Sequence, residues 1–235
     1  MTKRQEKCIL IIRKDKRTIL MNDNKKRAAE AVERLKKIYP DATCALEWGG
    51  SDSWKLLVMG RLSAQCTDAR VNIVCRELFS EFPTIDALAY APLERIEEIV
   101  RPCGLYRVKA SDIKSSCRML IDDFGGIVPD SMDELLKLPG VGRKTANLIL
   151  GDVFGREGYV CDTHCMRITG LLGITDGSKD PLKVEKQLRA ILPPEESSDF
   201  CHRIVLHGRA VCTARKPQCG NCRLANWCDF FHQTP

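Results

Sequence analysis

The sequence of 235 residues contains no long hydrophobic run, and this absence excludes several classes of protein. No stretch approaches the roughly 18 consecutive apolar residues that a membrane-spanning helix needs. The longest apolar run near the start, Cys8–Ile12, is too short for the core of a signal peptide. Low-complexity tracts and internal repeats are also absent. With 44% hydrophobic and 29% charged residues, the composition predicts an ordinary globular protein that is neither secreted nor bound to a membrane.

Cysteine, by contrast, is abundant: the chain contains 13, an odd number. Because no export signal is found, we expect a reducing compartment in which thiols do not form a disulfide framework. The high count therefore predicts metal ligation rather than disulfide bonds.

Positive charge is concentrated in two parts of the chain. The formal net charge is +6, but residues 1–37 alone carry 13 Lys/Arg against 5 Asp/Glu, so the remainder is slightly acidic. A second stretch, residues 200–228, has no acidic residue and five basic ones: Arg203, Arg209, Arg215, Lys216 and Arg223. Two such patches suit a polyanion such as nucleic acid. Solvated faces kept for solubility would show the same pattern, so charge alone leaves both interpretations open.

Apolar residues recur at intervals of three and four over most of the chain, which is the pattern of amphipathic helices. The clearest segments, with glycine or proline at one end or the other, are 71–82, 113–124 and 181–191. Strand-like segments occur only at residues 8–12 and 18–20, where either a small hairpin or a mobile arm fits. The turn-rich residues 48–53 mark the entry into a second helical body. The sequence therefore predicts an all-α protein.

A helix–turn–helix pattern occupies residues 131–151. Ser131 and Glu134 form a capping box that begins a short helix, Met132–Lys137. A tight turn follows, Leu138-Pro139-Gly140-Val141-Gly142, and a second helix begins near Arg143. Glycines before a helix leave backbone N–H groups bare, and these can bind a phosphate without side-chain charge. A plain structural hairpin fits this motif equally well when it is taken alone.

Lys144 lies in the first turn of the second helix. The positive end of the helix dipole disfavours its ammonium form. If Lys144 also faces a semi-buried cleft, desolvation acts in the same direction, and a neutral amine becomes available as a nucleophile. A solvated surface lysine is the alternative.

Asp162, followed by Thr163 and His164, is typical of a helix N-cap. A cap needs no catalytic role. Opposite a lysine nucleophile, however, a fixed carboxylate can stabilise cationic character at an anomeric carbon and move protons.

Four of the cysteines fall within 17 residues, spaced C-x6-C-x2-C-x5-C: Cys212, Cys219, Cys222 and Cys228. Four thiolates can hold one metal centre. Zinc sites usually have two close cysteine pairs and this segment has one, whereas four thiolates also suit an iron–sulfur cluster. Spacing alone leaves zinc and iron–sulfur open. In either case the loop between Cys212 and Cys219 holds Arg215 and Lys216 in a fixed position that suits phosphate binding.

Taken together, these motifs resemble the endonuclease III family of DNA glycosylases, within the helix–hairpin–helix glycosylase superfamily. The resemblance covers roughly residues 25 to 231 and rests on six segments: Leu62-Ser63-Ala64-Gln65-Cys66-Thr67-Asp68, Gly104-Leu105-Tyr106, Leu138–Asn147, Asp162-Thr163-His164, His207-Gly208-Arg209 and the four-cysteine loop. Each segment is weak alone, but their combination in this order is specific.

The resemblance implies an enzyme of base excision repair that removes oxidised pyrimidines from duplex DNA. Lys144 would displace the damaged base and form a Schiff base on the sugar, and β-elimination would then break the strand. Asp162 would assist base loss and proton transfer. Gln65 and Leu105 match residues that fill the gap left by the flipped nucleotide. Ser63, Asp68 and His164 match pocket-lining positions. Because monofunctional relatives lack the lysine, we expect a bifunctional glycosylase and lyase.

The resemblance also implies a [4Fe–4S] cluster on the four cysteines, with zinc as the less favoured alternative. It implies two helical lobes with a DNA-binding cleft between them and with Lys144 and Asp162 on opposite walls. Residues 46–156 would form the lobe with the hairpin, 25–45 plus 157–232 the lobe with the cluster, and 1–24 an arm of unknown role. We expect a monomer that acts on damaged double-stranded DNA in a bacterial cytoplasm, associated with the nucleoid.

Arg61 departs from the family pattern because it interrupts an otherwise apolar segment, residues 56–62. A buried unpaired guanidinium would be costly, so Arg61 must lie at a helix end, be paired, or face the DNA. This position leaves open a related glycosylase of altered lesion specificity. A non-catalytic DNA-binding or redox-sensing iron–sulfur module is the remaining alternative.

Overall fold

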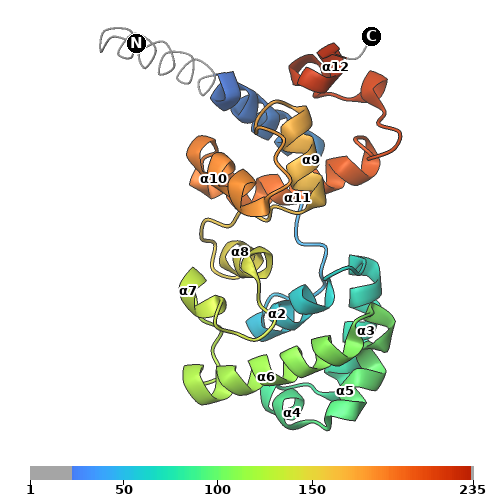
Figure 1. Cartoon of the computed structure of the whole chain (residues 1–235), viewed down its shortest axis with the longest axis vertical. Coiled ribbons are helices and arrows are strands. Elements are labelled where there is room, and N and C mark those ends of the chain that lie inside the picture. Colours follow the sequence, from blue (N-terminus) through green and yellow to red (C-terminus); the bar gives the residue numbers. More distant parts are fainter. Residues whose placement is uncertain (1–22, 234–235) are drawn as a thin grey trace, which may run out of the picture. The chain divides into compact units, whose positions relative to one another are not determined.

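The computed structural model describes residues 23–233, and every regular element within that range is helical (Figure 1). The prediction of an all-α fold is therefore confirmed. No helix in the described range is long and apolar enough to cross a bilayer. The strand-like segments at residues 8–12 and 18–20 lie outside the described residues.

The chain divides into two compact units. One unit consists of residues Thr43–Val160, and the other combines the described residues 23–42 with residues 161–233. The second unit is therefore built from two segments that are far apart in the sequence.

The longest element of the unit Thr43–Val160 is α6 (Tyr106–Phe124) (Figure 1). Helices α4 and α5 pack against α6, and α2 packs against α8. The remaining elements are α2 (Ser53–Leu62), α3 (Asp68–Glu81), α4 (Ile85–Tyr90), α5 (Leu93–Val100), η1 (Arg101–Cys103), α7 (Met132–Leu135) and α8 (Arg143–Asp152).

The helices of this unit follow the apolar spacing that predicted them. In α3, Val71, Val74 and Leu78 form the buried stripe, and the Thr67 side chain accepts a hydrogen bond from the backbone N–H of Arg70. Helix α6 ends at Gly125, which adopts a left-handed conformation with φ +62°. The predictions for residues 71–82 and 113–124 are therefore confirmed.

The short helix before the hairpin is smaller than predicted. Ser131 caps it as expected, accepting from the backbone N–H of Glu134 at 3.3 Å. Helix α7 ends at Leu135 rather than at Lys137, because Lys137 and the residue after it donate to the carbonyls three residues back and so tighten the chain into the turn.

The second unit contains a helix over residues 23–38, α9 (Thr163–Leu171), α10 (Pro181–Ile191), η2 (Pro194–Glu196), α11 (Ser197–Ala210), η3 (Cys219–Asn221), η4 (Ala225–Trp227) and α12 (Asp229–Gln233). Helix α10 has the bounds that the sequence predicts, and the Asp180 side chain caps it by accepting from the N–H of Leu182 at 3.0 Å. Helices α9 and α11 pack together, which places the segment after Asp162 beside the helix that leads into the cysteine loop.

Candidate functional site

The turn between α7 and α8 is anchored by its apolar side chains and exposes its glycines. Leu138 and Val141 are buried, whereas Gly140 and Gly142 are exposed. Gly140 has φ +71°, a conformation that favours glycine. Leu138 and Val141 therefore hold the turn in place, and the parts of it that remain accessible are the backbone around the glycines and the exposed Arg143.

A pair of charged residues supports this turn from behind. Arg61 donates to Asp112 Oδ2 through Nε and Nη2, each at 2.7 Å. A Cβ atom on Gly140 would come within 2.7 Å of both side chains. On the same helix as Asp112, the Ser116 hydroxyl donates to the carbonyl of Pro139 at 2.6 Å. Arg61 is thus at the end of α2 and also paired, which accounts for its place in an otherwise apolar segment.

Lys144 lies in the first turn of α8 and is exposed. Gly142 is the N-cap residue of α8 and, having no side chain, makes no capping hydrogen bond of the side-chain kind. Gly60 lets α2 approach this helix closely, since a Cβ there would meet Thr145 Cγ2 at 2.8 Å. The structure therefore supplies the helix end that the sequence predicts, but it places Lys144 in an exposed setting rather than a semi-buried one.

Two exposed residues of the unit Thr43–Val160 have a strained backbone conformation. Gln65 has φ +55° and Leu105 has φ +49°, and they are the only non-glycine residues with positive φ in the described range. Leu105 is 60% exposed although it is apolar. Ser63 lies close by and donates to the carbonyl of Gly60 at 2.8 Å, and Asp68 begins α3. Strain at exposed side chains of this kind is typical of functional loops.

Asp162 is half-buried and caps α9 in the second unit, accepting from the N–H of Cys165 at 2.7 Å. Two residues on, His164 packs against α11, where a Cβ on Gly208 would lie 2.3 Å from His164 Nδ1. The absence of a side chain at Gly208 therefore makes room for His164.

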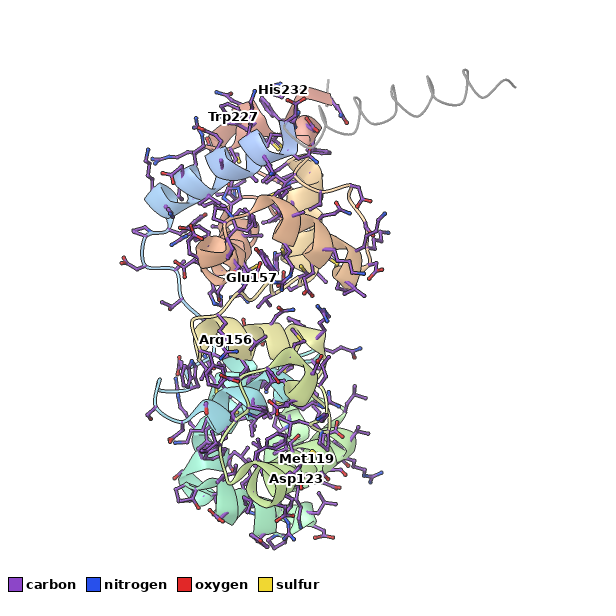
Figure 2. All side chains as sticks on the ribbon, turned by 90° about the vertical axis from the view of Figure 1, so that its left-hand side faces the viewer. Met119, Asp123, Arg156, Glu157, Trp227 and His232 are labelled. Atoms are coloured by element: carbon purple, nitrogen blue, oxygen red, sulfur yellow. The ribbon has the colours of Figure 1, made fainter. Side chains whose placement is uncertain are left out.

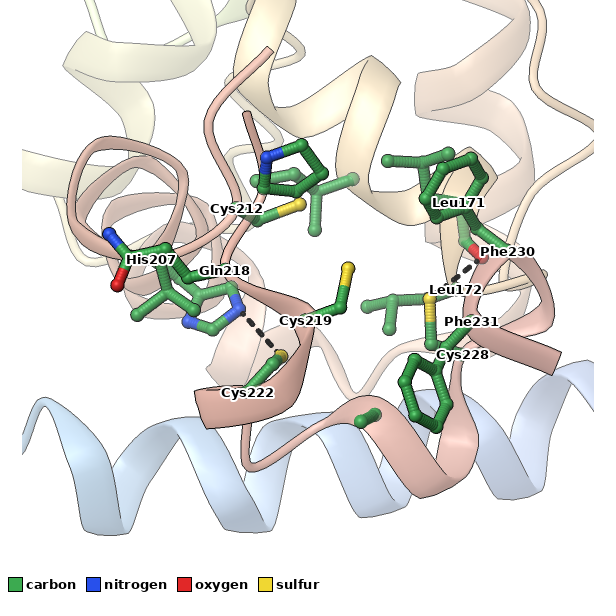
Figure 3. A pocket seen from close by; sticks show the side chains of 14 residues that line it. Leu171, Leu172, His207, Cys212, Gln218, Cys219, Cys222, Cys228, Phe230 and Phe231 are labelled. Carbon is green, nitrogen blue, oxygen red and sulfur yellow. Dashed lines mark hydrogen bonds between the residues drawn. The ribbon is translucent and has the colours of Figure 1, made fainter. Parts of the chain in front are cut away.

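The four cysteines line one cavity together with apolar side chains (Figure 3). Their sulfurs have polar neighbours: Arg167 Nη1 donates to Cys212 Sγ at 3.5 Å, and Cys228 Sγ lies 3.3 Å from the carbonyl of Leu171. His207 Nε2 lies 3.4 Å from Cys222 Sγ, and Tyr39 lies 3.3 Å from the other ring nitrogen.

This arrangement suits four thiolates around a cationic centre. Burial raises the pKa of Cys222 and of Cys228, and the neighbouring cysteines raise both further by charge repulsion. Without a positive centre these two thiols therefore resist ionisation, and iron or zinc would favour their thiolate forms. Arg167 and the imidazole of His207 can stabilise the thiolates as hydrogen-bond donors. In the described residues no three His, Cys, Asp or Glu side chains are already gathered closely enough to hold a single ion.

The helix over residues 23–38 secures the cysteine loop. Arg34 donates to the carbonyl of Arg223 at 3.2 Å, and its guanidinium lies 5.9 Å from the centre of the Trp227 ring, labelled in Figure 2. Arg27 donates to the carbonyl of Leu172 at 3.1 Å and forms an ion pair with Asp229. Part of the basic character of the N-terminal segment is therefore used in packing.

The basic residues of the second patch separate into two kinds. Arg209, Arg215 and Lys216 are exposed, and the Thr213 hydroxyl fixes the loop by donating to the carbonyl of Lys216 at 2.7 Å. Arg203 is buried and paired with Glu196 at 3.2 Å and with Asp199 at 2.6 Å. Of the five basic residues in this stretch, Arg203 therefore belongs to the packing of α11 and does not contribute to an exposed basic surface.

Three further residues at these sites were not predicted from the sequence. Lys109 is completely buried beneath the loops that carry Gln65 and Leu105. Asp112 pairs with Arg61, and Arg167 contacts both Cys212 and His164. The only sequence signal for Asp112 is Arg61, because a charged residue in an apolar segment implies an opposite charge nearby in the folded protein.

Comparison with known proteins identifies the family. Residues 58–194 match the family described as HhH-GPD superfamily base excision DNA repair protein, and residues 212–228 match the iron-sulfur binding domain of endonuclease III. The chain is 46% identical to endonuclease III of Synechocystis sp. over 88% of this chain and 94% of that protein. It is 36% identical to endonuclease III of Escherichia coli over 88% and 97% of the two chains. The solved structure of a non-covalent endonuclease III–DNA complex matches with a TM-score of 0.83 and 42% identity, over 88% of this chain and 96% of that chain.

Proposed function

The chain belongs to the endonuclease III family of HhH-GPD base excision DNA repair proteins, and from this membership we propose that it removes oxidised pyrimidines from duplex DNA and then cleaves the strand at the abasic site. The observation that carries the proposal is the position of Lys144. It is exposed in the first turn of α8, directly after the glycine turn. An amine at this place lies next to backbone N–H groups suited to a DNA phosphate.

In the proposed reaction the Lys144 amine attacks C1′ of the damaged nucleotide. A bond forms between Nζ and C1′ as the glycosidic bond breaks, and the departing base takes up a proton. Opening of the sugar gives a Schiff base, and loss of a proton from C2′ then expels the 3′ phosphate by β-elimination. Asp162 supports the cationic character at C1′ and moves protons. Its hydrogen bond from Cys165 N–H leaves the second carboxylate oxygen available for this role.

The DNA-binding residues divide by the kind of contact they make. The turn Leu138–Gly142 with Arg143, the exposed Arg209, and the loop residues Arg215 and Lys216 hold the phosphate backbone. Gln65 and Leu105 enter the gap left by the extruded nucleotide, and the exposed apolar side chain of Leu105 offsets the lost stacking. Ser63, Asp68 and His164, which match base-contacting positions of the family, are the residues that we propose contact the extruded base.

Cys212, Cys219, Cys222 and Cys228 would hold a [4Fe–4S] cluster, a proposal supported by the iron-sulfur binding domain match over residues 212–228 and by the cavity that the four cysteines line. When bound, the cluster supplies four metal–thiolate bonds that tie the cysteine loop together. The chain's own residues then present Arg215 and Lys216 from a loop whose two ends are fixed. We propose further that the protein works as a monomer on damaged double-stranded DNA in a bacterial cytoplasm, at the nucleoid; its bacterial relatives support a bacterial origin.

Borohydride trapping tests this function. The wild-type protein should become covalently attached to abasic-site DNA when the Schiff base is reduced, and it should release thymine glycol from a duplex. Lys144→Gln should abolish trapping, whereas Lys137→Gln, a matched change at an exposed lysine of the same hairpin, should retain it. Trapping by Lys144→Gln at the wild-type level would refute the assigned nucleophile. Salt-dependent DNA binding without any cleavage would instead support a non-catalytic module.

A further inference from the structure

Lys109 of α6 is completely buried, which is unusual for a lysine. Its ammonium group donates to three backbone carbonyls: Leu62 O at 2.9 Å, Ala64 O at 2.7 Å and Cys103 O at 2.8 Å. The three N–H donors of the group therefore have one acceptor each. Burial lowers the pKa of Lys109, yet all three acceptors favour the protonated form.

The three carbonyls belong to two separate segments of the chain. Leu62 and Ala64 precede Gln65, and Cys103 stands two residues before Leu105. These are the two segments that contain the non-glycine residues with positive φ. A lysine 45 and 47 residues away from Ala64 and Leu62 thus joins both strained segments at one point. Conformations of this kind persist only where the surroundings hold them in place.

We propose that Lys109 is a positioning residue that keeps the loops of Gln65 and Leu105 at a fixed spacing, so that both side chains enter the DNA together when a nucleotide is extruded. The inference rests on the proposed function for the role of those two side chains. Lys109 itself is buried and touches no substrate. Its effect is confined to the step in which a nucleotide leaves the stack, and the chemistry at Lys144 is not altered.

A buried ammonium suits this task better than an apolar side chain of the same length. Three donors arranged as a tripod can hold three carbonyls that no regular helix or sheet pairs. Methionine fills a similar volume but leaves these carbonyls without Lys109 as a donor. Arginine keeps the charge, but its planar head has a different donor geometry.

The test compares Lys109→Met with Lys114→Met. Lys114 lies on the same helix, is half-buried and donates to a single carbonyl, that of Ala91 at 2.7 Å, away from both loops. For each variant, two rate constants are measured: single-turnover base release from a lesion duplex, and borohydride trapping on single-stranded abasic DNA, which needs no extrusion of a nucleotide. The first rate constant is divided by the second. We expect this ratio to fall at least tenfold in Lys109→Met and to stay within twofold of wild type in Lys114→Met.

An unchanged ratio in a folded Lys109→Met protein overturns the inference. If that variant does not fold, Lys109→Arg is measured in its place, with the same ratio expected to fall and an unchanged ratio again decisive. Amide hydrogen exchange at residues 63–66 and 103–105 gives an independent readout, because faster exchange in the Lys109 variants is expected even without DNA. A wild-type protein inactive on both substrates would refute the proposed function, while the exchange data would still decide whether Lys109 holds the two loops.

Discussion

Arg61 and Asp112 form an ion pair directly behind the hairpin turn, with Arg61 Nε and Nη2 both 2.7 Å from Asp112 Oδ2. The pair joins the end of α2 to the middle of α6 and occupies the space next to Gly140. A residue that breaks an apolar segment therefore supports the hairpin, and it gives no reason to expect a change in the lesion that is recognised.

Removal of this ion pair should weaken the protein measurably. Arg61→Met leaves the half-buried Asp112 carboxylate without its partner, so we expect the free energy of unfolding to fall by about 1–2 kcal/mol, less than for a fully buried pair. The matched control is Arg76→Met at the exposed pair with Glu47, where the change should stay below about 0.5 kcal/mol. Urea unfolding measures both. Equal effects of the two substitutions would contradict a supporting role for Arg61.

The substitution Asp162→Asn should distinguish the role of Asp162 as the N-cap of α9 from its proposed role in base release. Asparagine caps a helix about as well as aspartate, so the free energy of unfolding should change by less than about 0.5 kcal/mol. Loss of the carboxylate should slow base release by about 10²–10⁴-fold. Single-turnover kinetics and thermal unfolding check the two parts. Asp162→Ala should lose both stability and activity, and full activity in Asp162→Asn would restrict this residue to capping.

Gly208→Ala should push His164 out of its position. The added methyl group would lie 2.3 Å from His164 Nδ1 and 3.0 Å from Ile168 Cδ1, so overpacking should cost about 1–3 kcal/mol of unfolding free energy. A double-mutant cycle with His164→Ala provides the control, since removal of the ring should make Gly208→Ala much less costly. Additive costs would show that His164 is not the residue displaced.

Metal analysis should identify the group held by the cysteine loop. We expect about four iron atoms per chain and a broad absorption near about 400 nm. Cys212→Ser should reduce both, whereas Cys117→Ser, at a buried cysteine of the other unit, should leave them unchanged. A colourless protein that contains one zinc ion would refute the iron–sulfur cluster.

Alkaline pH should destabilise the protein through its buried thiols. Burial raises the pKa of Cys117 to about 12 from an ordinary value of 9.0. Between these values the unfolded thiol loses its proton while the folded one keeps it, so stability falls as pH rises. Cys117→Ala removes this contribution, and its unfolding free energy should therefore decline less than that of wild type between pH 8 and pH 10. Parallel declines would contradict the assignment.

Local signals explain which parts of the fold could be predicted. Apolar spacing and caps depend on residues a few positions apart, and they located α3, α6 and α10 as well as the start of α8. The cavity lined by the four cysteines could also be predicted from the sequence, because these cysteines lie within 17 residues of one another. The end of α7 was placed two residues too late, since the tightening into the turn has no distinctive residue of its own.

Contacts between distant residues explain the rest. Whether Arg203 is solvated or buried depends on carboxylates of Glu196 and Asp199 that only the folded helix brings to it. Lys109 is surrounded by carbonyls from segments up to 47 residues away, and nothing in its own neighbourhood in the sequence distinguishes it from a surface lysine. Arg167 likewise reaches Cys212 across 45 residues because α9 and α11 pack together.

The attachment of residues 23–38 to the last part of the chain has a consequence for biosynthesis. Arg27 and Arg34 are synthesised early, whereas their respective partners Asp229 and Arg223 are made 202 and 189 residues later. The helix over residues 23–38 is therefore synthesised well before the cysteine segment that packs against it. When iron is inserted, the cysteine loop can already be held by its contacts with this helix. A chain truncated so that it lacks Arg27 and Arg34 would have to bind iron without those contacts.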